Sequence, residues 1–166
     1  FKKVGKKNLM IRSEDGALQV AHHFYDTGHI KIGYLGPSIA PDGNNKLAGF
    51  QKGLEEHNLS LHAVLECNQH ETAENQKAYQ IISKYFDEHD PTEVTAWFAH
   101  SDIAASDIIR ALIQRGIRVP EDVSVCGYND TLLSRKMIPS LTSVASPIDE
   151  IARNAIELLI HEIRND

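Results

Sequence analysis

Three things are scarce in this sequence: cysteine, long apolar runs and positive charge. Its two cysteines, Cys67 and Cys126, have neither metal-ligand nor redox-motif spacing, and such sparse use suits a reducing cytoplasm. No run approaches the roughly 20 apolar residues of a membrane-spanning helix, and no stretch has the pattern of a signal peptide. We therefore expect a cytoplasmic protein with no disulfide framework and no membrane partner.

What remains is enough for about one folded domain. The chain has 166 residues, of which 42% are hydrophobic, so it can bury a sizeable core. It contains neither a low-complexity segment nor an internal repeat. Because the sequence starts with Phe1 rather than methionine, we expect it to be a piece of a longer protein.

The charge balance argues against direct contact with nucleic acid. The formal net charge is −6, and four of the 17 cations lie in the first seven residues. Beyond residue 7, 13 cations face 23 anions, which is a net charge of −10. Binding to phosphate backbones requires clustered cations, and we interpret the terminal lysines as a frayed, solvated end rather than a basic arm. We expect no specific DNA binding by these residues.

Segments with strand-like and helix-like patterns alternate along the chain. Four short apolar stretches are predicted strands: 30–35, 61–65, 94–99 and 123–126. Apolar residues with helical spacing predict helices over 17–27, 46–57, 72–88 and 103–115, one or two turns within 131–138, and a last helix over 147–160. Ser13 is the expected N-cap of the first helix, and Gly28 its C-terminal glycine. Crossovers of these lengths predict a three-layer, Rossmann-like α/β fold with a parallel sheet.

Polar loops follow all four predicted strands. Because the strands are parallel, these loops open on the same edge of the sheet, which is where open α/β sheets bind ligands. The pattern therefore predicts a cleft for a small ligand at this edge. The loops hold residues 38–45, 68–70, 100–102 and 129–130.

The most informative stretch runs from Gly116 to Asp130. A helix should end at Gly116, a turn follows at 120–122, and a short apolar strand comes next. We expect Gly127 to let the backbone turn, so that Asn129 and Asp130 arrive at the end of the strand. An amide and a carboxylate there can fix the hydroxyl groups of a ligand, although Asn-Asp is also common in solvated turns.

The sequence carries no set of residues typical of an enzyme. His100, Asp102 and Asp130 could form an acid–base set, but the sequence has no nucleophile elbow and no paired catalytic carboxylates. We therefore expect a binding protein rather than an enzyme.

Cofactor and metal motifs are missing as well. Gly33 and Gly36 lack the third glycine, at a helix start, of a pyrophosphate-binding fingerprint, so we expect no nucleotide cofactor. His22, His23 and His29 lack the spacing of metal ligands and are interpreted as surface or packing residues.

The stretch 116–130 reads G-I-R-V-P-E-D-V-S-V-C-G-Y-N-D. It resembles the LacI/GalR family of sugar-responsive transcriptional repressors, whose effector domains typically read G-L-R-V-P-E-D-V-S-V-V-G-Y-D-D here. Two further passages are similar to the family: G-H-I-K-I-G-Y-L-G over 28–36 and P-S-L-T-S-V over 139–144. The resemblance covers nearly the whole chain, from about Arg12 to Asp166.

This resemblance implies a two-lobed effector domain like a type I periplasmic binding protein, with this chain as its C-terminal lobe. Residues 1–10 would be a linker or a remnant of the missing lobe, and residues 11–145 the effector-binding lobe. Residues 146–166 would form a helix that packs on the missing N-terminal lobe. The family also has an N-terminal helix-turn-helix, so operator DNA would be contacted only outside this chain. The implied partners are a small-molecule effector, expected to be a sugar, and a second copy in a homodimer.

The resemblance further implies five effector-binding residues: Lys46, His70, Ser101, Asp102 and Asn129. Lys46 stands where the family has an arginine, whose bidentate fork a lysine cannot make, and Asn129 stands where the family usually has aspartate. His70 aligns with an aromatic residue that stacks on the effector. Simpler interpretations stay open: an exposed first-turn lysine, a loop histidine and, for Asp102, a helix cap. Ser101 is then the better candidate for direct contact.

Two functions stay open at this point. The leading one is effector sensing and dimerisation within a LacI-type repressor. The alternative is an extracytoplasmic sugar-binding protein of the same fold, which an export signal upstream would favour. Because positions 46 and 129 depart from the family's common residues, the sequence does not name the effector.

Overall fold

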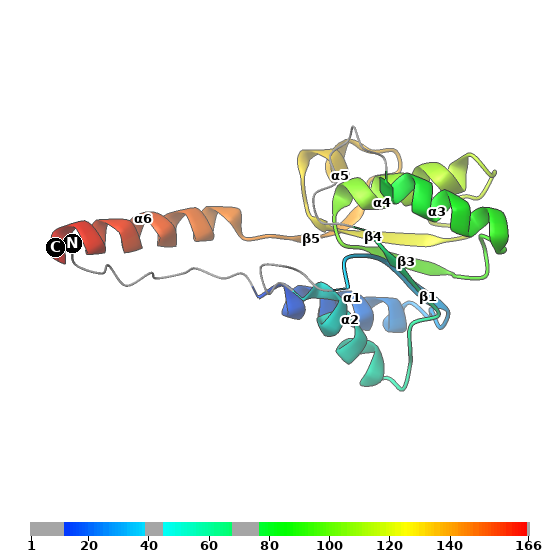
Figure 1. The fold of residues 1–166 in the computed structure, drawn as a ribbon, viewed down its shortest axis with the longest axis horizontal. Helices are drawn as coiled ribbons and strands as arrows, with labels where there is room; N and C mark the ends of the chain where they lie inside the picture. Colours follow the sequence, from blue (N-terminus) through cyan, green and yellow to red (C-terminus); the bar gives the residue numbers. More distant parts are fainter. Residues whose placement is uncertain (1–11, 39–44, 68–76, 166) are drawn as a thin grey trace.

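A five-stranded parallel sheet organises the chain (Figure 1). The computed structural model describes residues 12–38, 45–67 and 77–165. The strands follow the order β2-β1-β3-β4-β5, and each neighbouring pair is parallel. Their bounds are β1 Ile32–Gly36, β2 Ala63–Glu66, β3 Ala96–Ala99, β4 Ser124–Asn129 and β5 Thr142–Ala145. The predicted parallel α/β fold is confirmed.

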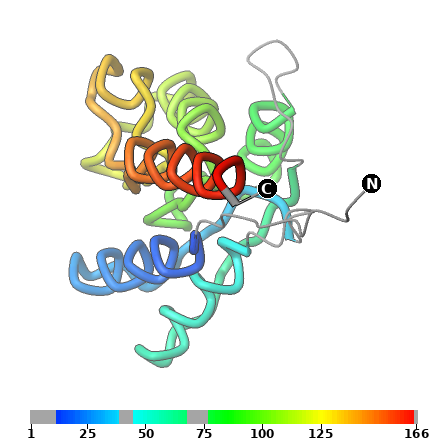
Figure 2. Tube along the Cα trace, turned by 90° about the vertical axis from the view of Figure 1, so that its left-hand side faces the viewer, coloured from blue at the N-terminus to red at the C-terminus, as the bar shows by residue number. Residues whose placement is uncertain are grey.

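Helices cover both faces of this sheet. On one face lie α1 (Ser13–Asp26) and α2 (Lys46–Glu55), and on the other α3 (Lys77–Glu88) and α4 (Asp102–Ile113), as Figure 1 shows. The short helix α5 (Leu132–Lys136) connects β4 to β5. The last helix, α6 (Ile148–Asn165), extends away from the sheet. Figure 2 views the molecule along α6, with α1 and α2 on one side of it and α3 to α5 on the other.

The helix α6 carries an unpartnered apolar face. Ile156, Leu159 and Ile163 are 58%, 60% and 68% exposed, although apolar residues at this spacing normally mark the buried side of a helix. Across the described part of the chain, no helix is both long and apolar enough to cross a membrane. A face of this kind is typical of a surface that another protein element covers.

The strand β5 is an element that the apolar pattern did not predict. It reads Thr-Ser-Val-Ala, and it is the edge strand next to β4. All of its residues are exposed or half-buried. An edge strand of this kind does not need the continuous apolar run that marks a strand buried on both faces, so hydrophobic patterning missed it.

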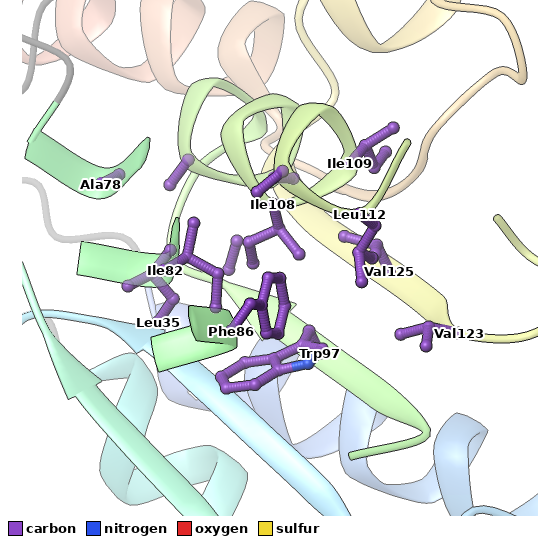
Figure 3. Close-up of a cluster of buried hydrophobic side chains, with 14 of the residues drawn as sticks. Leu35, Ala78, Ile82, Phe86, Trp97, Ile108, Ile109, Leu112, Val123 and Val125 are labelled. Atoms are coloured by element: carbon purple, nitrogen blue, oxygen red, sulfur yellow. The ribbon is translucent and has the colours of Figure 1, made fainter. Parts of the chain in front are cut away.

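The central strand β3 separates two hydrophobic cores. Trp97 faces α3 and α4 and packs edge to face on Phe86, within the cluster that Figure 3 shows. Phe98, the next residue, faces α1 and α2 and packs against Phe50 and Tyr34. Both β3 side chains are fully buried. Burial on both faces explains why this strand reads as an unbroken apolar run.

The C-terminal end of α1 forms as predicted. Gly28 has a φ of +87°, a conformation that glycine adopts without a steric cost. Its N–H donates to the Tyr25 carbonyl, and the His29 N–H donates to the Phe24 carbonyl, both at 2.9 Å. This pair of bonds is the Schellman arrangement, which satisfies the last carbonyls of a helix.

The N-terminal end of α1 differs from the prediction. Ser13 is the first helical residue rather than the cap, and the residue at the cap position, Arg12, makes no side-chain capping bond. Ser13 is 1% exposed, and its carbonyl accepts a hydrogen bond from the Tyr128 hydroxyl at 3.4 Å. Packing against β4, rather than local capping, fixes where α1 begins.

The role expected of Gly127 is also wrong. β4 does not turn there but continues to Asn129, and the left-handed residues are Asn129 and Asp130, with φ of 103° and 48°. A Cβ atom at position 127 would lie 2.5 Å from Asp102 Oδ1 and 2.9 Å from Leu141 Cδ2. Glycine is required because two other elements approach the strand closely, and not because the backbone bends.

Candidate functional site

The carboxyl ends of the strands bring together four of the five predicted ligand-binding residues. Ser101 and Asp102 follow β3, Asn129 ends β4, and Lys46 begins α2, which follows β1 along the chain. The fifth, His70, lies outside the described residues. The predicted convergence of loops on one edge is therefore what the described part of the chain shows. Their predicted contact with an effector stays a prediction.

Lys46 reaches across this edge from the first turn of α2. Its Nζ donates a hydrogen bond to the His100 carbonyl at 2.8 Å and lies 4.0 Å above the centroid of the Tyr128 ring. The Asn45 side chain accepts a hydrogen bond from the Ala48 N–H at 3.0 Å and so caps the same helix. The ammonium group therefore links α2 to the ends of β3 and β4, and its contact with a ring face adds cation–π attraction.

Ser101, rather than the predicted Asp102, caps the helix α4. Ser101 is the N-cap of α4, with extended φ and ψ, and its Oγ accepts a hydrogen bond from the Ala104 N–H at 3.2 Å. This is the usual capping bond at a helix start. The predicted cap, Asp102, is instead the first helical residue, and its side chain leaves the helix for other elements.

The Asp102 carboxylate is 1% exposed and accepts three hydrogen bonds. Its Oδ2 accepts from the Thr131 N–H at 2.6 Å and from the Thr131 hydroxyl at 2.8 Å. Its Oδ1 accepts from the Ser143 hydroxyl at 2.5 Å. A buried carboxylate is tolerated only with such partners. Asp102 therefore ties the start of α4 to the turn after β4 and to β5.

Asn129 and Asp130 lie next to the hydrogen bonds of Asp102, and their side chains have different partners. Asn129 is exposed, and its Oδ1 accepts a 3.2 Å hydrogen bond from the Ser146 hydroxyl. Asp130 pairs with Arg135, and the hydrogen bond from that guanidinium lowers the pKa of the Asp130 carboxyl. Its N–H donates to Ser143 Oγ at 3.0 Å. Asn129 is thus the side chain that this turn presents to solvent.

A hollow of about 420 Å³ opens beside Asn129. Asp130 and Arg135 line it on the lobe side, and Ser146 and Asp149 line it on the side of α6. Its volume lies in the range that small-ligand sites usually have. Asn129 is therefore both exposed and placed at a cavity.

His100 is a buried residue directly after the end of β3. It is 5% exposed, and its Nδ1 lies 3.7 Å from Cys67 Sγ. Burial, and after it the positive charge of Lys46, lower the pKa of His100 to about 4. The imidazole is therefore neutral at pH 7, and His100 adds no charge to this edge of the sheet.

The chemistry of this edge suits binding more than catalysis. Both aspartates are already held by hydrogen bonds or by an arginine, so neither is poised as a general base. Burial raises the pKa of the Cys126 thiol to about 12, which keeps it protonated and unreactive. Among the described residues, no group of three or more His, Cys, Asp or Glu side chains is arranged to hold a metal ion.

Sequence patterns alone missed three residues that hold this site. Ser143 belongs to the unpredicted strand β5, and Thr131 and Tyr128 received no role. The hydroxyl of Ser143 accepts from the Asp130 N–H and donates to Asp102, so it joins both aspartates. Its place in the P-S-L-T-S-V passage was the one available signal, but a partner 41 residues away cannot be inferred from spacing.

Comparisons with known proteins agree with this geometry. The family model described as "Periplasmic binding protein-like domain" matches residues 21–166. The transcriptional repressor PurR of Photobacterium profundum is 32% identical over 160 residues, which are 92% of this chain and 45% of that protein. The regulator DegA of Bacillus subtilis is 31% identical over 144 residues, which are 86% of this chain and 41% of that protein. The chain thus spans less than half the length of these curated relatives.

Solved structures show the same fold. A Lac repressor dimer bound to operator and an anti-inducer superimposes with a TM-score of 0.79 at 26% identity, covering 92% of this chain and 52% of that one. A periplasmic binding protein/LacI regulator of Alkaliphilus metalliredigens, in complex with D-xylulofuranose, gives a TM-score of 0.80 at 28% identity, covering 93% of this chain and 56% of that one.

Ser101 and Asp102 make different hydrogen bonds at the start of α4, and the difference can be measured. We expect Ser101→Ala to lower the free energy of unfolding by about 1 kcal/mol, the usual effect of a lost cap. Asp102→Ala should lower it by roughly 3 kcal/mol, because three hydrogen bonds to a charged acceptor are lost together. Urea unfolding of the wild type and both variants measures the two effects. A smaller loss for Asp102→Ala than for Ser101→Ala would contradict the tie.

The buried His100 should make stability depend on pH. Its ordinary pKa of 6.5 applies to the unfolded chain, and its pKa in the folded chain is about 4. Between these values the unfolded state binds more protons, so stability falls as the pH falls, by about 3 kcal/mol in total. His100→Gln cannot titrate and should lose less stability between pH 7 and pH 4.5, whereas exposed His89→Gln should match the wild type. Equal losses in all three proteins would show that His100 is not the group responsible.

Proposed function

The chain belongs to the periplasmic binding protein-like domain family, within its LacI/GalR group, and we propose that it is the effector-sensing lobe of a transcriptional repressor. The observation that carries this proposal is the exposed Asn129 at a hollow on the carboxyl edge of the sheet. The curated relatives PurR and DegA are transcriptional regulators, and this supports a regulatory role over catalysis. It also supports the cytoplasm as the place where the protein acts.

The effector that this edge suits best is a neutral, hydroxyl-rich molecule such as a sugar. Asn129 offers both a donor and an acceptor, the neutral His100 adds no charge, and the carboxylate of Asp130 is already paired with Arg135. The charges of Asp130 and Arg135 compensate each other, whereas Asp149 and Glu150, which also line the hollow, disfavour an anionic effector. The complex of the Alkaliphilus protein with D-xylulofuranose supports a sugar.

We assign the proposed ligand contacts to Lys46, Ser101 and Asn129, with Asp102 holding the loops in place. Lys46 and Ser101 lie beside the His100 carbonyl, and Asn129 borders the hollow at the same edge of the sheet. His70 keeps its predicted stacking role as a hypothesis. An effector held here between two lobes would shift the population of hinge states and so change operator affinity. The DNA contacts themselves would lie in a helix-turn-helix outside this chain.

A solute-binding protein that works outside the cytoplasm is the weaker alternative. The curated relatives that match this chain are regulators, and the 116–130 stretch resembles theirs. We keep the repressor as the proposal.

Binding of sugars to the full-length protein tests the site. Asn129 has a φ of 103°, so Asn129→Gly removes the amide without strain at that position. We expect at least a tenfold loss of affinity for whichever of ribose, lactose or xylulose binds the wild type, by calorimetry, with an unchanged melting temperature. Gln51→Ala, which removes an exposed amide from α2, is the matched control and should bind normally. Unchanged affinity in Asn129→Gly would remove Asn129 from the site.

Two exposed apolar surfaces fit two further parts of this proposal. The first is the face of α6, which we assign to packing on the N-terminal lobe, with residues 1–10 as a linker or a remnant of that lobe and residues 11–145 as the effector-binding lobe. The second lies on α5 and the following loop, where Leu132, Leu133 and Ile138 are 66%, 40% and 94% exposed. We assign this second surface to contact with another copy in a homodimer.

The two assignments predict opposite effects of a buried charge. Ile138→Glu should convert the full-length dimer to monomers in sedimentation experiments while urea unfolding of the monomer stays cooperative. Leu159→Glu should lower the free energy of unfolding by roughly 2 kcal/mol or more, because it buries a carboxylate between lobes, and should leave the subunit mass at that of a dimer. The reverse pattern would show that the two surfaces have been assigned the wrong way round.

A further inference from the structure

A second cavity lies at the opposite edge of the sheet from Asn129. Its volume is about 240 Å³, and its wall includes the starts of β4 and β5, the last turn of α1 and one side of α4. Ser124 and Thr142 are the first residues of their strands, so this is the amino edge. It shares no residue with the hollow beside Asn129. Its existence does not depend on the function proposed above.

The walls of this amino-edge cavity are mainly apolar. Phe24 comes from α1, Ile109 from α4, Val125 from β4 and Leu141 from the segment before β5. Figure 3 shows Ile109 and Val125 on the same side of the α3–α4 core, and both belong to that core. No Asp, Glu, Lys or Arg is among the described residues that line the cavity. A lining of this kind favours a neutral ligand over an ion.

The ring of His29 gives the cavity a hydrogen-bond acceptor, the Nε2 atom. The Thr95 hydroxyl donates its proton to the Lys31 carbonyl at 3.3 Å. With its proton directed there, the hydroxyl accepts in its 3.0 Å hydrogen bond with His29 Nδ1, and on this geometry we assign the ring proton to Nδ1. Burial, and after it the nearby His23, lower the pKa of His29, which favours the neutral ring. In this tautomer Nε2 bears a lone pair and is an acceptor.

The hydroxyl of Thr27 is also an acceptor on the side that faces the cavity. Thr27 Oγ1 donates to the His23 carbonyl at 2.7 Å and approaches the Phe24 carbonyl at 3.2 Å. Its proton is therefore used within α1, and towards the cavity it can only accept. The Phe24 ring meets the His29 ring edge to face, with centroids 5.7 Å apart, and so restrains the imidazole. Both atoms therefore suit a ligand that brings the proton for its hydrogen bond, and the hydroxyls of Ser124, Ser140 and Thr142 also line the cavity.

The volume limits the size of such a ligand. A dry apolar cavity of roughly 150 Å³ holds one benzene ring. In proportion, 240 Å³ suits a molecule of about nine or ten heavy atoms, which is the size of a fused pair of small rings. A mostly apolar lining suits the apolar faces of such a ring system.

We propose that the amino-edge cavity binds a small, neutral, fused-ring heteroaromatic molecule that donates a ring N–H to Nε2 of His29. Phe24, Ile109 and Leu141 supply apolar contacts to the faces and edges of the ring. Because the cavity contacts α1, α4, β4 and β5 together, its occupant would connect four elements of the lobe.

Indole and 1-methylindole form the probe pair for this site, since they share the ring system and differ in the N–H donor. Calorimetry on the full-length protein should show saturable binding of indole and at least tenfold weaker binding of 1-methylindole. Binding of neither compound, or equal binding of both, would overturn the proposal. This comparison needs only the wild type, so it does not depend on a variant that folds.

Variants then locate the site. His29→Leu should lower the affinity for indole at least tenfold and abolish the difference between the two probes. The matched change His62→Leu, at a histidine that does not line the cavity, should leave both affinities unchanged. Ser124→Phe, which places a ring inside the cavity, should prevent binding of either probe. Normal indole binding by both His29→Leu and Ser124→Phe would place the compound elsewhere and refute the assignment.

Discussion

The buried carboxylate of Asp102 is the interaction on which the proposed site depends. It accepts three hydrogen bonds from two residues that lie 29 and 41 positions later in the chain. These bonds hold the start of α4, the turn after β4 and the strand β5 together at one point. Gly127 is part of the same constraint, because any side chain there would collide with Oδ1 of Asp102. The exposed amide of Asn129 is presented two residues further on, from a strand whose end is fixed in this way.

The electrostatics of this edge follow from the same burial. An ionised carboxylate out of contact with water is stable only when hydrogen bonds replace its hydration, and Thr131 and Ser143 supply them. His100, also buried, is neutral instead. Lys46 directs its charge at a carbonyl and an aromatic face. What the edge offers to a ligand is therefore hydrogen-bonding capacity beside the carboxylates of Asp149 and Glu150, and this is the physical reason for preferring a neutral sugar to an anionic metabolite.

The two edges of the sheet differ in kind. The carboxyl edge is polar and open, and its hollow is bordered by the first residues of α6, so the position of that helix affects the shape of the hollow. The amino edge encloses a smaller, mainly apolar cavity in which His29 and Thr27 offer acceptors. Two sites of such different chemistry on one lobe would respond to different molecules.

The sequence by itself determined the alternation of strands and helices, the parallel sheet and the edge at which polar loops meet, because apolar periodicity and crossover length are local properties. It also determined the glycine end of α1, which depends on one backbone conformation. Only the tertiary structure decided that Ser101 caps α4 while Asp102 does not, that Gly127 makes room rather than a turn, and that Thr142–Ala145 is a strand. Each of these depends on partners that are distant in sequence. The Asp102 carboxylate bonds to donors that only folding brings close to it. The polar strand β5 forms because it pairs with β4.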